Sequence, residues 1–162
     1  MNFRFEKILK HKTFTELIKK TEERESDRIF CRHGMEHIIS VARIAYIMAL
    51  EHQLDVSKDI VYAAALLHDI GRNAEYEHGI SHSQAGADIA EQILSDCGYS
   101  QTETREIVAA ILSHRHDKFD TNASPLDMLI CKADKLSRTC FDCKAYSECN
   151  WSEEKKNKTL VY

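Results

Sequence analysis

Apolar residues recur at helical spacing along most of the chain. Positions i, i+3, i+4 and i+7 are repeatedly apolar, which is the pattern of a helix with one buried face. Such helices are predicted at residues 4–22 (as one or two helices), 36–51, 58–68, 86–97, 101–114 and 125–134. No segment alternates apolar and polar residues for the length of a strand. The sequence therefore predicts an all-α, compact single-domain bundle of about six helices.

Local signals mark several of the predicted helix ends. The run "SQTE" at 100–103 matches a capping box, in which a serine and a glutamate three residues later satisfy each other's backbone donors. Ser124 followed by Pro125 fits an N-cap with proline at the first helical position. Gly98 is a natural stop for the helix before it. These signals agree with the helices that the apolar spacing predicts.

The length, charge and apolar runs of the sequence favour some classes of protein over others. A chain of 162 residues is the usual size of one domain. With 22 Lys and Arg against 26 Asp and Glu, its formal charge is −4, which argues against a nucleic-acid partner. We find no signal peptide and no run of 18 apolar residues, so we expect a cytoplasmic protein with no membrane partner. We expect a helical domain at 1–138 and a cysteine-containing appendage at 139–162, packed on that domain.

Metal-binding residue types recur near the ends or inward faces of the predicted helices. These residues are His37, His68, Asp69, His82, His114 and Asp134. In "AAALLHDIGR" at 63–72, a histidine and an aspartate end an apolar run, and burying both is costly unless something compensates them. Helices packed in a bundle can bring such side chains to one place, where a cation would compensate the buried pair.

Three stretches in order carry a family resemblance. They are "HIISVA" at 37–42, "LLHDIGR" at 66–72 and "KADKL" at 132–136. Together they resemble the HD-domain superfamily of metal-dependent phosphohydrolases, and the resemblance covers roughly residues 30–138. It implies a helical bundle in which His37, His68, Asp69 and Asp134 hold a first metal ion.

Two further stretches extend the resemblance. "HSQAGA" at 82–87 and "ILSH" at 111–114 resemble motifs that add a second metal in dinuclear members, among them cyclic-dinucleotide phosphodiesterases and hydrolases of diadenosine polyphosphates. Asp69 would then bridge the two ions, because a carboxylate has two oxygens. His33 lies four residues before His37, where some dinuclear relatives have a glutamate ligand, but we interpret it as a bystander.

The resemblance and the ligand types together predict a reaction. A divalent transition metal (Fe, Mn, Co or Zn), with one or two ions in the site, would activate water to cleave a phosphomonoester, phosphodiester or phosphoanhydride bond. The expected substrate is a small phosphorylated molecule, with a nucleotide as the first candidate. The expected catalytic residues are His68, Asp69 and Arg72. Basic residues near the ligands could bind phosphate: Arg72, Lys118, Lys135 and Arg138. The alternative is a metal-containing, nucleotide-binding sensor without turnover.

The appendage contains a second candidate metal site. Cys140, Cys143 and Cys149 have the spacing C-x2-C-x5-C. Two thiols separated by two residues are typical of half a structural zinc site, and an iron–sulfur cluster also uses cysteines. Cys131 or His116 could supply the missing fourth ligand. The competing interpretation is that these are free thiols in a reducing compartment.

Overall fold

The computed structural model describes residues 3–114 and 123–162 of the chain. Within these residues the regular structure is helical, without strands, so the prediction of an all-α fold is confirmed. The elements are α1 (Phe5–Ile8), α2 (Lys12–Arg24), α3 (Met35–Glu51), α4 (Lys58–Leu67), α5 (Arg72–His78), α6 (His82–Cys97), α7 (Gln101–Ser113), α8 (Pro125–Leu136) and a short 3₁₀ helix, η1 (Cys140–Asp142).

The longer helices follow the predicted spacing, and the short ones do not. α1 is a separate four-residue helix, and α5 begins directly after Gly71, where the sequence predicted only a helix end. α6 begins at His82, four residues before the predicted start. Both predicted caps are present as capping boxes, Ser100 with Glu103 on α7 and Ser124 with Asp127 on α8. Short helices escape the pattern because they contain too few turns to show a periodicity.

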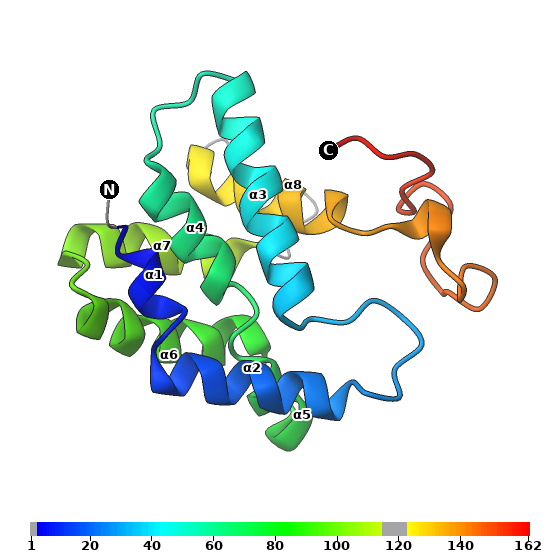
Figure 1. The fold of residues 1–162 in the computed structure, drawn as a ribbon, viewed down its shortest axis with the longest axis horizontal. Coiled ribbons are helices and arrows are strands. Elements are labelled where there is room, and N and C mark those ends of the chain that lie inside the picture. Colours follow the sequence, from blue (N-terminus) through cyan, green and yellow to red (C-terminus); the bar gives the residue numbers. More distant parts are fainter. Residues whose placement is uncertain (1–2, 115–122) are drawn as a thin grey trace.

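The core lies between two groups of helices. α3 packs against α4 and α8, α6 packs against α7, and α7 also contacts α4 and α8 (Figure 1). α2 crosses one side of this body, and its Phe14 and Ile18 are buried in the core. Apolar side chains such as Ile38, Leu67 and Ile130 are almost fully excluded from water, and each stabilises the fold by about 1.5–3 kcal/mol through burial.

Gly71 lets the start of α6 lie close to the turn after α4. A Cβ atom built on Gly71 would lie 2.1 Å from the carbonyl oxygen of His82 and 2.5 Å from the backbone nitrogen of Gly86. Neither backbone atom can move aside without shifting α6. By contrast, a Cβ atom on Gly86 would make only ordinary contacts of 3.4 Å or more. Gly71 is therefore required by the close approach of two backbones that carry site residues.

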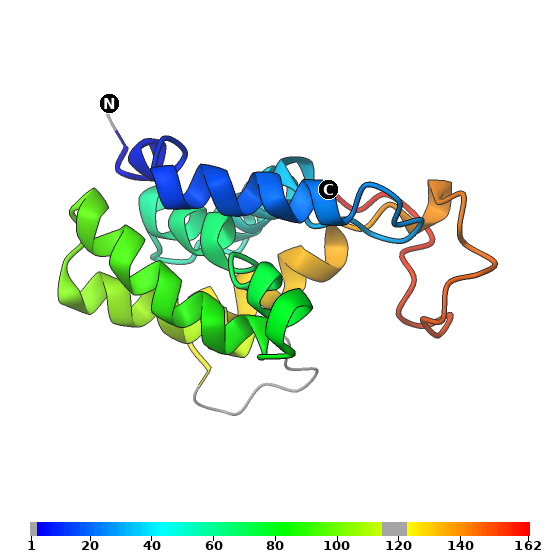
Figure 2. The ribbon, with the colours of Figure 1, turned by 90° about the horizontal axis from the view of Figure 1, so that it is seen from below.

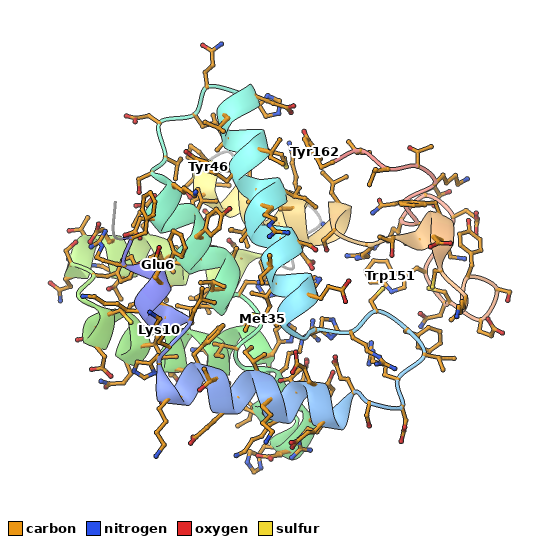
Figure 3. All side chains as sticks on the ribbon, in the orientation of Figure 1. Glu6, Lys10, Met35, Tyr46, Trp151 and Tyr162 are labelled. Atoms are coloured by element: carbon orange, nitrogen blue, oxygen red, sulfur yellow. The ribbon has the colours of Figure 1, made fainter. Side chains whose placement is uncertain are left out.

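The C-terminal segment, residues 139–162, has little regular structure and only one buried residue, Ala145. The amide of Asn157 ties it to α8 by donating to the carbonyl oxygens of Lys135 and Arg138, both at 2.8 Å. Figures 1 and 2 both place this segment at one end of the molecule, beside the loop between α2 and α3. Trp151 points toward that loop, and Tyr162 returns to α3 (Figure 3), where its hydroxyl donates to Glu51.

In the part of the chain that the structure describes, no helix combines the length and the apolar character that crossing a membrane requires.

Candidate metal centre

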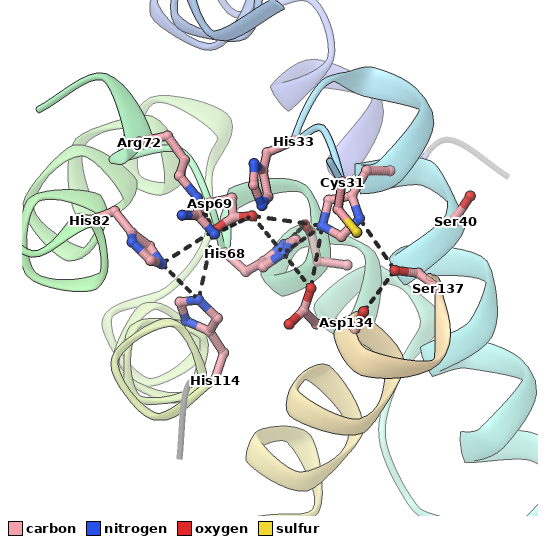
Figure 4. Close-up of polar contacts among 12 residues, drawn as sticks. Cys31, His33, Ser40, His68, Asp69, Arg72, His82, His114, Asp134 and Ser137 are labelled. Carbon is pink, nitrogen blue, oxygen red and sulfur yellow. Dashed lines mark hydrogen bonds and ion pairs between the residues drawn. The ribbon is translucent and has the colours of Figure 1, made fainter. Parts of the chain in front are cut away.

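Asp69 lies at the middle of a cluster of histidines, with its side chain almost completely buried. Its two carboxylate oxygens face opposite ways (Figure 4). Oδ2 lies 3.7 Å from Nε2 of His37 and 3.4 Å from Nε2 of His68. Oδ1 lies 3.3 Å from Nε2 of His82 and 3.7 Å from Nε2 of His114. One carboxylate therefore joins two groups of potential ligands.

Each group has the composition and spacing of a metal site. Among the described residues, His37, His68 and Asp69 form one set whose ligand atoms lie within 4.8 Å of one another, and Asp69, His82 and His114 form the other. Asp134 adds a carboxylate oxygen to the first set, 3.4 Å from Nε2 of His37.

Helix ends position these side chains. His37 lies in the first turn of α3, His68 is the C-cap of α4, and Asp69 follows it immediately. The remaining three come from three other helices: His82 at the start of α6, His114 at the C-cap of α7 and Asp134 in the last turn of α8. All six predicted ligands thus come together, although they come from five different helices and their ends.

Hydrogen bonds fix which nitrogen of each imidazole faces the centre. Nδ1 of His68 donates to the carbonyl oxygen of Ala65 at 2.7 Å, and Nδ1 of His114 donates to that of Ile111 at 2.5 Å. Nδ1 of His82 donates to the carboxylate of Glu75 at 2.8 Å. A proton on Nδ1 leaves the lone pair of a neutral imidazole on Nε2, which is the atom that points at Asp69.

His37 is oriented in the same way by a serine. The Ser137 hydroxyl donates to the carbonyl oxygen of Asp134 at 2.7 Å, so its oxygen accepts from Nδ1 of His37 at 3.2 Å. Ser137 therefore sets the tautomer of His37 through a contact that sequence patterns do not mark.

The orientation of the four imidazoles indicates whether these residues could hold a metal ion. Nε2 of His37 lies 3.3 Å from Nε2 of His68, and Nε2 of His82 lies 3.1 Å from Nε2 of His114. Neutral imidazoles in these tautomers would direct lone pairs at each other and at a carboxylate, which is unfavourable unless a cation lies between them. Histidines that bind a metal through one ring nitrogen typically donate a hydrogen bond from the other, here Nδ1, to a carbonyl or carboxylate oxygen. The residues present therefore fit a divalent metal.

The electrostatics of the centre also favour a cation. Burial raises the pKa of Asp69, but His68 and Arg72 outweigh it and hold that pKa well below the usual range. Burial lowers the pKa of His68, yet Asp69 and Asp134 raise it to about 9. Burial and the charge of His68 lower the pKa of His114 to about 4. The carboxylates of Asp69 and Asp134 thus attract positive charge to the first group, whether a proton or a metal ion.

Arg72 holds the carboxylate of Asp69 through hydrogen bonds. Its Nε donates to Oδ1 of Asp69 at 3.0 Å and its Nη2 to Oδ2 at 3.4 Å. Nη1 donates to Glu75 at 3.3 Å, the same carboxylate that orients His82. The predicted catalytic residue Arg72 therefore contacts both Asp69 and Glu75, the carboxylate that orients His82.

A cavity of about 240 Å³ opens onto the centre. Its lining includes the site residues His37, His114 and Asp134. It also includes five basic residues: Arg28, Arg72, Lys135, Arg138 and Lys155. Three of the four predicted phosphate-binding residues are among them. The fourth, Lys118, and the candidate cysteine partner His116 lie outside the described residues.

His33, which we interpreted as a bystander, lines the same cavity. Its ring lies edge-on to His37, with 5.6 Å between the ring centroids. The buried Glu25 accepts from Nδ1 of His33 at 2.7 Å and from its backbone N–H at 2.6 Å, and also accepts from Tyr76. In the sequence, the only sign of a role for His33 was its position four residues before His37. Its partner Glu25 lies in a polar, charged stretch that is typical of solvent-exposed residues, so the contact between them was not predicted.

Comparison with known proteins agrees with this geometry. The family model for the HD domain matches residues 34–139. The chain belongs to the HD domain family. HD domains bind divalent metals, and the family comprises metal-dependent phosphohydrolases, so the resemblance in the sequence is confirmed.

Relatives of this HD domain protein differ in length. A protein of Clostridium beijerinckii, described as an uncharacterized protein, is 40% identical over 159 residues, covering 98% of this chain and 99% of the relative. The ribonuclease Y of Acetivibrio thermocellus is 35% identical over 127 residues, covering 78% of this chain but 21% of the relative. The chain thus spans about a fifth of that ribonuclease.

A solved structure has the same fold. It is the crystal structure of a predicted HD superfamily hydrolase from an uncultured Thermotogales bacterium, with a TM-score of 0.66 and 24% identity over 88% of this chain and 79% of the other. This match supports the fold.

Proposed function

We propose that this HD domain protein is a dinuclear metal-dependent phosphohydrolase acting on a small phosphorylated molecule. The observation that carries the proposal is the orientation of Asp69, whose two oxygens face two separate groups of histidines. His37, His68, Asp69 and Asp134 would hold one ion, and Asp69, His82 and His114 the other. Bound there, Fe, Mn, Co or Zn supplies Lewis acidity and a water of lowered pKa for attack on phosphorus.

The basic side chains of the cavity would bind the phosphate. Arg138 lies at its rim, with Nη2 3.7 Å from Oδ2 of Asp134 and its guanidinium stacked on Trp151 at 4.1 Å. A stacked guanidinium keeps its donors in a fixed plane, which suits the oxygens of a phosphoryl group. Arg72 has a positioning role in this proposal, because its donors are directed at Asp69 and Glu75.

His33 is placed to protonate the leaving group. Glu25 orients it through Nδ1, so Nε2 is the atom left to act on the substrate. A histidine held by a buried carboxylate is a common arrangement for general acid–base catalysis. The proton would pass from Nε2 of His33 to the departing oxygen as the phosphorus–oxygen bond breaks.

The size and charge of the cavity support the proposed substrate class. A volume of about 240 Å³ and a basic rim suit a phosphate group with a limited attached part, such as a nucleotide. The ribonuclease Y relatives favour a second candidate, the phosphodiester of RNA. Against that stands the absence of an overall positive charge, since the formal net charge is −4. A metal-containing sensor that binds nucleotide without turnover is the non-catalytic alternative.

The test is product formation from a panel of nucleotides and a short RNA, with each candidate metal supplied in turn. Chromatography detects the nucleotide and RNA fragments, and a separate assay detects inorganic phosphate. We expect turnover of at least one small nucleotide and its loss, by about 10³-fold or more, in Asp69→Ala. The control is Asp88→Ala, which removes an exposed carboxylate from α6. Helical circular dichroism should be nearly the same in all three proteins.

The outcomes separate the candidates. Cleavage of RNA alone would move the substrate to nucleic acid. Saturable nucleotide binding without product, in every metal, would favour the sensor. Equal turnover by Asp69→Ala and the unaltered protein would contradict the proposal.

A further inference from the structure

A second cavity, of about 370 Å³, lies between the α2–α3 loop and the C-terminal segment. Four of the six cysteines of the chain line it: Cys31 from the loop, and Cys140, Cys143 and Cys149 from the segment. All four are reduced thiols in the structure. Cys31 is more than a hundred positions away from the others in sequence, so only the fold brings the four thiols to one cavity.

The predicted fourth ligand, Cys131, is not the one that the structure brings to this cavity. It lies on α8, almost completely buried, and the cavity is lined without it. The reason is helical geometry, because Cys131 shares the inward face of α8 with Ile130 and Leu126, whereas the segment leaves α8 beyond Leu136.

The spacing of the thiols distinguishes a single ion from a larger group. Tetrahedral zinc, with Zn–S bonds of about 2.3 Å, draws its four sulfurs to about 3.8 Å from one another. Among the described residues, no three cysteine sulfurs lie within 4.8 Å of one another, although the histidine sites meet that criterion. A cavity of about 370 Å³ lined by four thiols has room for an inorganic cluster, for which cysteine thiolates are the usual ligands.

The surroundings of the cavity suit a negatively charged cluster. Arg28 and Lys156 line it, and Arg138 lies near Cys31. Aromatic and apolar side chains, Phe30, Tyr146 and Trp151 among them, form much of the remaining wall. Cationic groups balance the charge of four thiolates, and apolar walls limit the access of water to the cluster.

The C-terminal segment gains little order from apolar burial. Ala145 is its only buried residue, whereas Phe141 and Trp151 are more than 40% exposed. A segment that buries so little apolar surface gains little from the hydrophobic effect, and a metal group can replace the missing core.

We propose that Cys31, Cys140, Cys143 and Cys149 ligate an iron–sulfur cluster of the 4Fe–4S type, which fastens the C-terminal segment to the α2–α3 loop. Each thiol loses its proton on binding iron, and the iron and sulfide come from cluster assembly in the cell. Because Arg28, Cys31 and Trp151 line both cavities, the cluster supports one wall of the catalytic cavity.

The experiment is iron and acid-labile sulfide analysis of the full chain, expressed and purified without oxygen. We expect about four sulfide atoms per chain, together with the broad visible absorption of a 4Fe–4S cluster. Sulfide is the deciding measurement because iron in the histidine centre brings none, so the result does not depend on the proposed hydrolase activity. Cys31→Ser should lose most of the sulfide and the absorption while keeping its helical circular dichroism.

Matched controls are Cys131→Ser and Cys97→Ser, which alter cysteines outside the cavity. Both should retain the sulfide of the unaltered chain in their folded fraction. The proposal is overturned if the unaltered protein contains zinc and no labile sulfide. The same holds if the protein contains neither zinc nor labile sulfide. It is also overturned if Cys31→Ser keeps its full sulfide while Cys131→Ser loses it.

Discussion

The histidine–aspartate centre and the cysteine-lined cavity lie side by side but are built in different ways. Helix ends carry the centre, and hydrogen bonds to carbonyl, serine or carboxylate groups orient its four imidazoles. A loop and a segment with one short 3₁₀ helix carry the cysteines. The packed core therefore positions the first set of ligands before any metal binds, whereas under our proposal the cluster adds order to the second set.

This difference predicts how each region responds to damage. Loss of metal from the histidine centre leaves the helices packed, because their stability comes from buried apolar surface. Loss of a cluster from the cysteine cavity would free the C-terminal segment and leave the bundle folded. Three variants test this contrast, and they differ in the expected change in the free energy of unfolding.

The largest effect is expected from Gly71→Ala, which disturbs the packing that supports the histidine centre. The new methyl group would meet the backbone of His82 and Gly86, so α6 must shift. We expect a loss of about 3 kcal/mol in the free energy of unfolding, measured by urea denaturation. We also expect weaker metal binding, because the shift moves His82.

Gly86→Ala is the matched control for that variant. Its methyl group makes only ordinary contacts, and alanine favours the helix. Stability equal to or above that of the unaltered protein is expected. Equal destabilisation by both variants would contradict the idea that the approach of two backbones decides the geometry.

A smaller effect, dependent on pH, is expected from Glu25→Gln, at the start of the loop that carries both His33 and Cys31. Burial raises the pKa of Glu25, but hydrogen bonds from His33 and Tyr76 outweigh it and lower that pKa from 4.5 to about 2. A depressed pKa stabilises the folded protein above the unfolded value of 4.5, and this stabilisation is lost as the pH falls toward 2.

The unaltered protein should therefore exceed Glu25→Gln by on the order of 2 kcal/mol in unfolding free energy near neutral pH. The difference should shrink as urea denaturation is repeated at acidic pH. A difference that stays constant down to about pH 3 would mean that the charge of Glu25 does not carry the effect.

The smallest change in global stability is expected from Asn157→Ala, which removes two hydrogen bonds between the C-terminal segment and α8. The segment buries little, so the unfolding free energy should change by less than about 0.5 kcal/mol. Limited proteolysis should nevertheless cut residues 139–162 faster, because local opening becomes easier. A large fall in global stability would show that the segment belongs to the cooperative core.

The helices and the site differ in how far the sequence predicts them. α3, α4, α7 and α8 were predicted close to their observed bounds because their buried faces repeat over several turns. Asp69 and its histidines were found because ligand types at successive helix ends leave a signal in order and spacing. Every predicted ligand of the centre does lie in one cluster, and their binding of metal stays a prediction.

The contacts that were missed are those without a periodic signal. Ser137 and Glu75 orient histidines through single hydrogen bonds, which depend on side-chain positions that only the packed structure fixes. Cys31 was overlooked as a partner of the other cysteines because it is distant in sequence and lies in a loop. Proximity along the chain favoured Cys131 instead, which the helical register of α8 directs into the core.

The distribution of the ligands along the chain has a consequence for folding. His37 and Asp134 come from α3 and α8, so the first group cannot form until nearly the whole domain has been synthesised. Contacts of such long sequence separation are slow to form, because the intervening chain must first be ordered. Newly made chains should therefore pack their helices first and acquire metal afterwards, so that metal scarcity limits activity rather than the yield of folded protein.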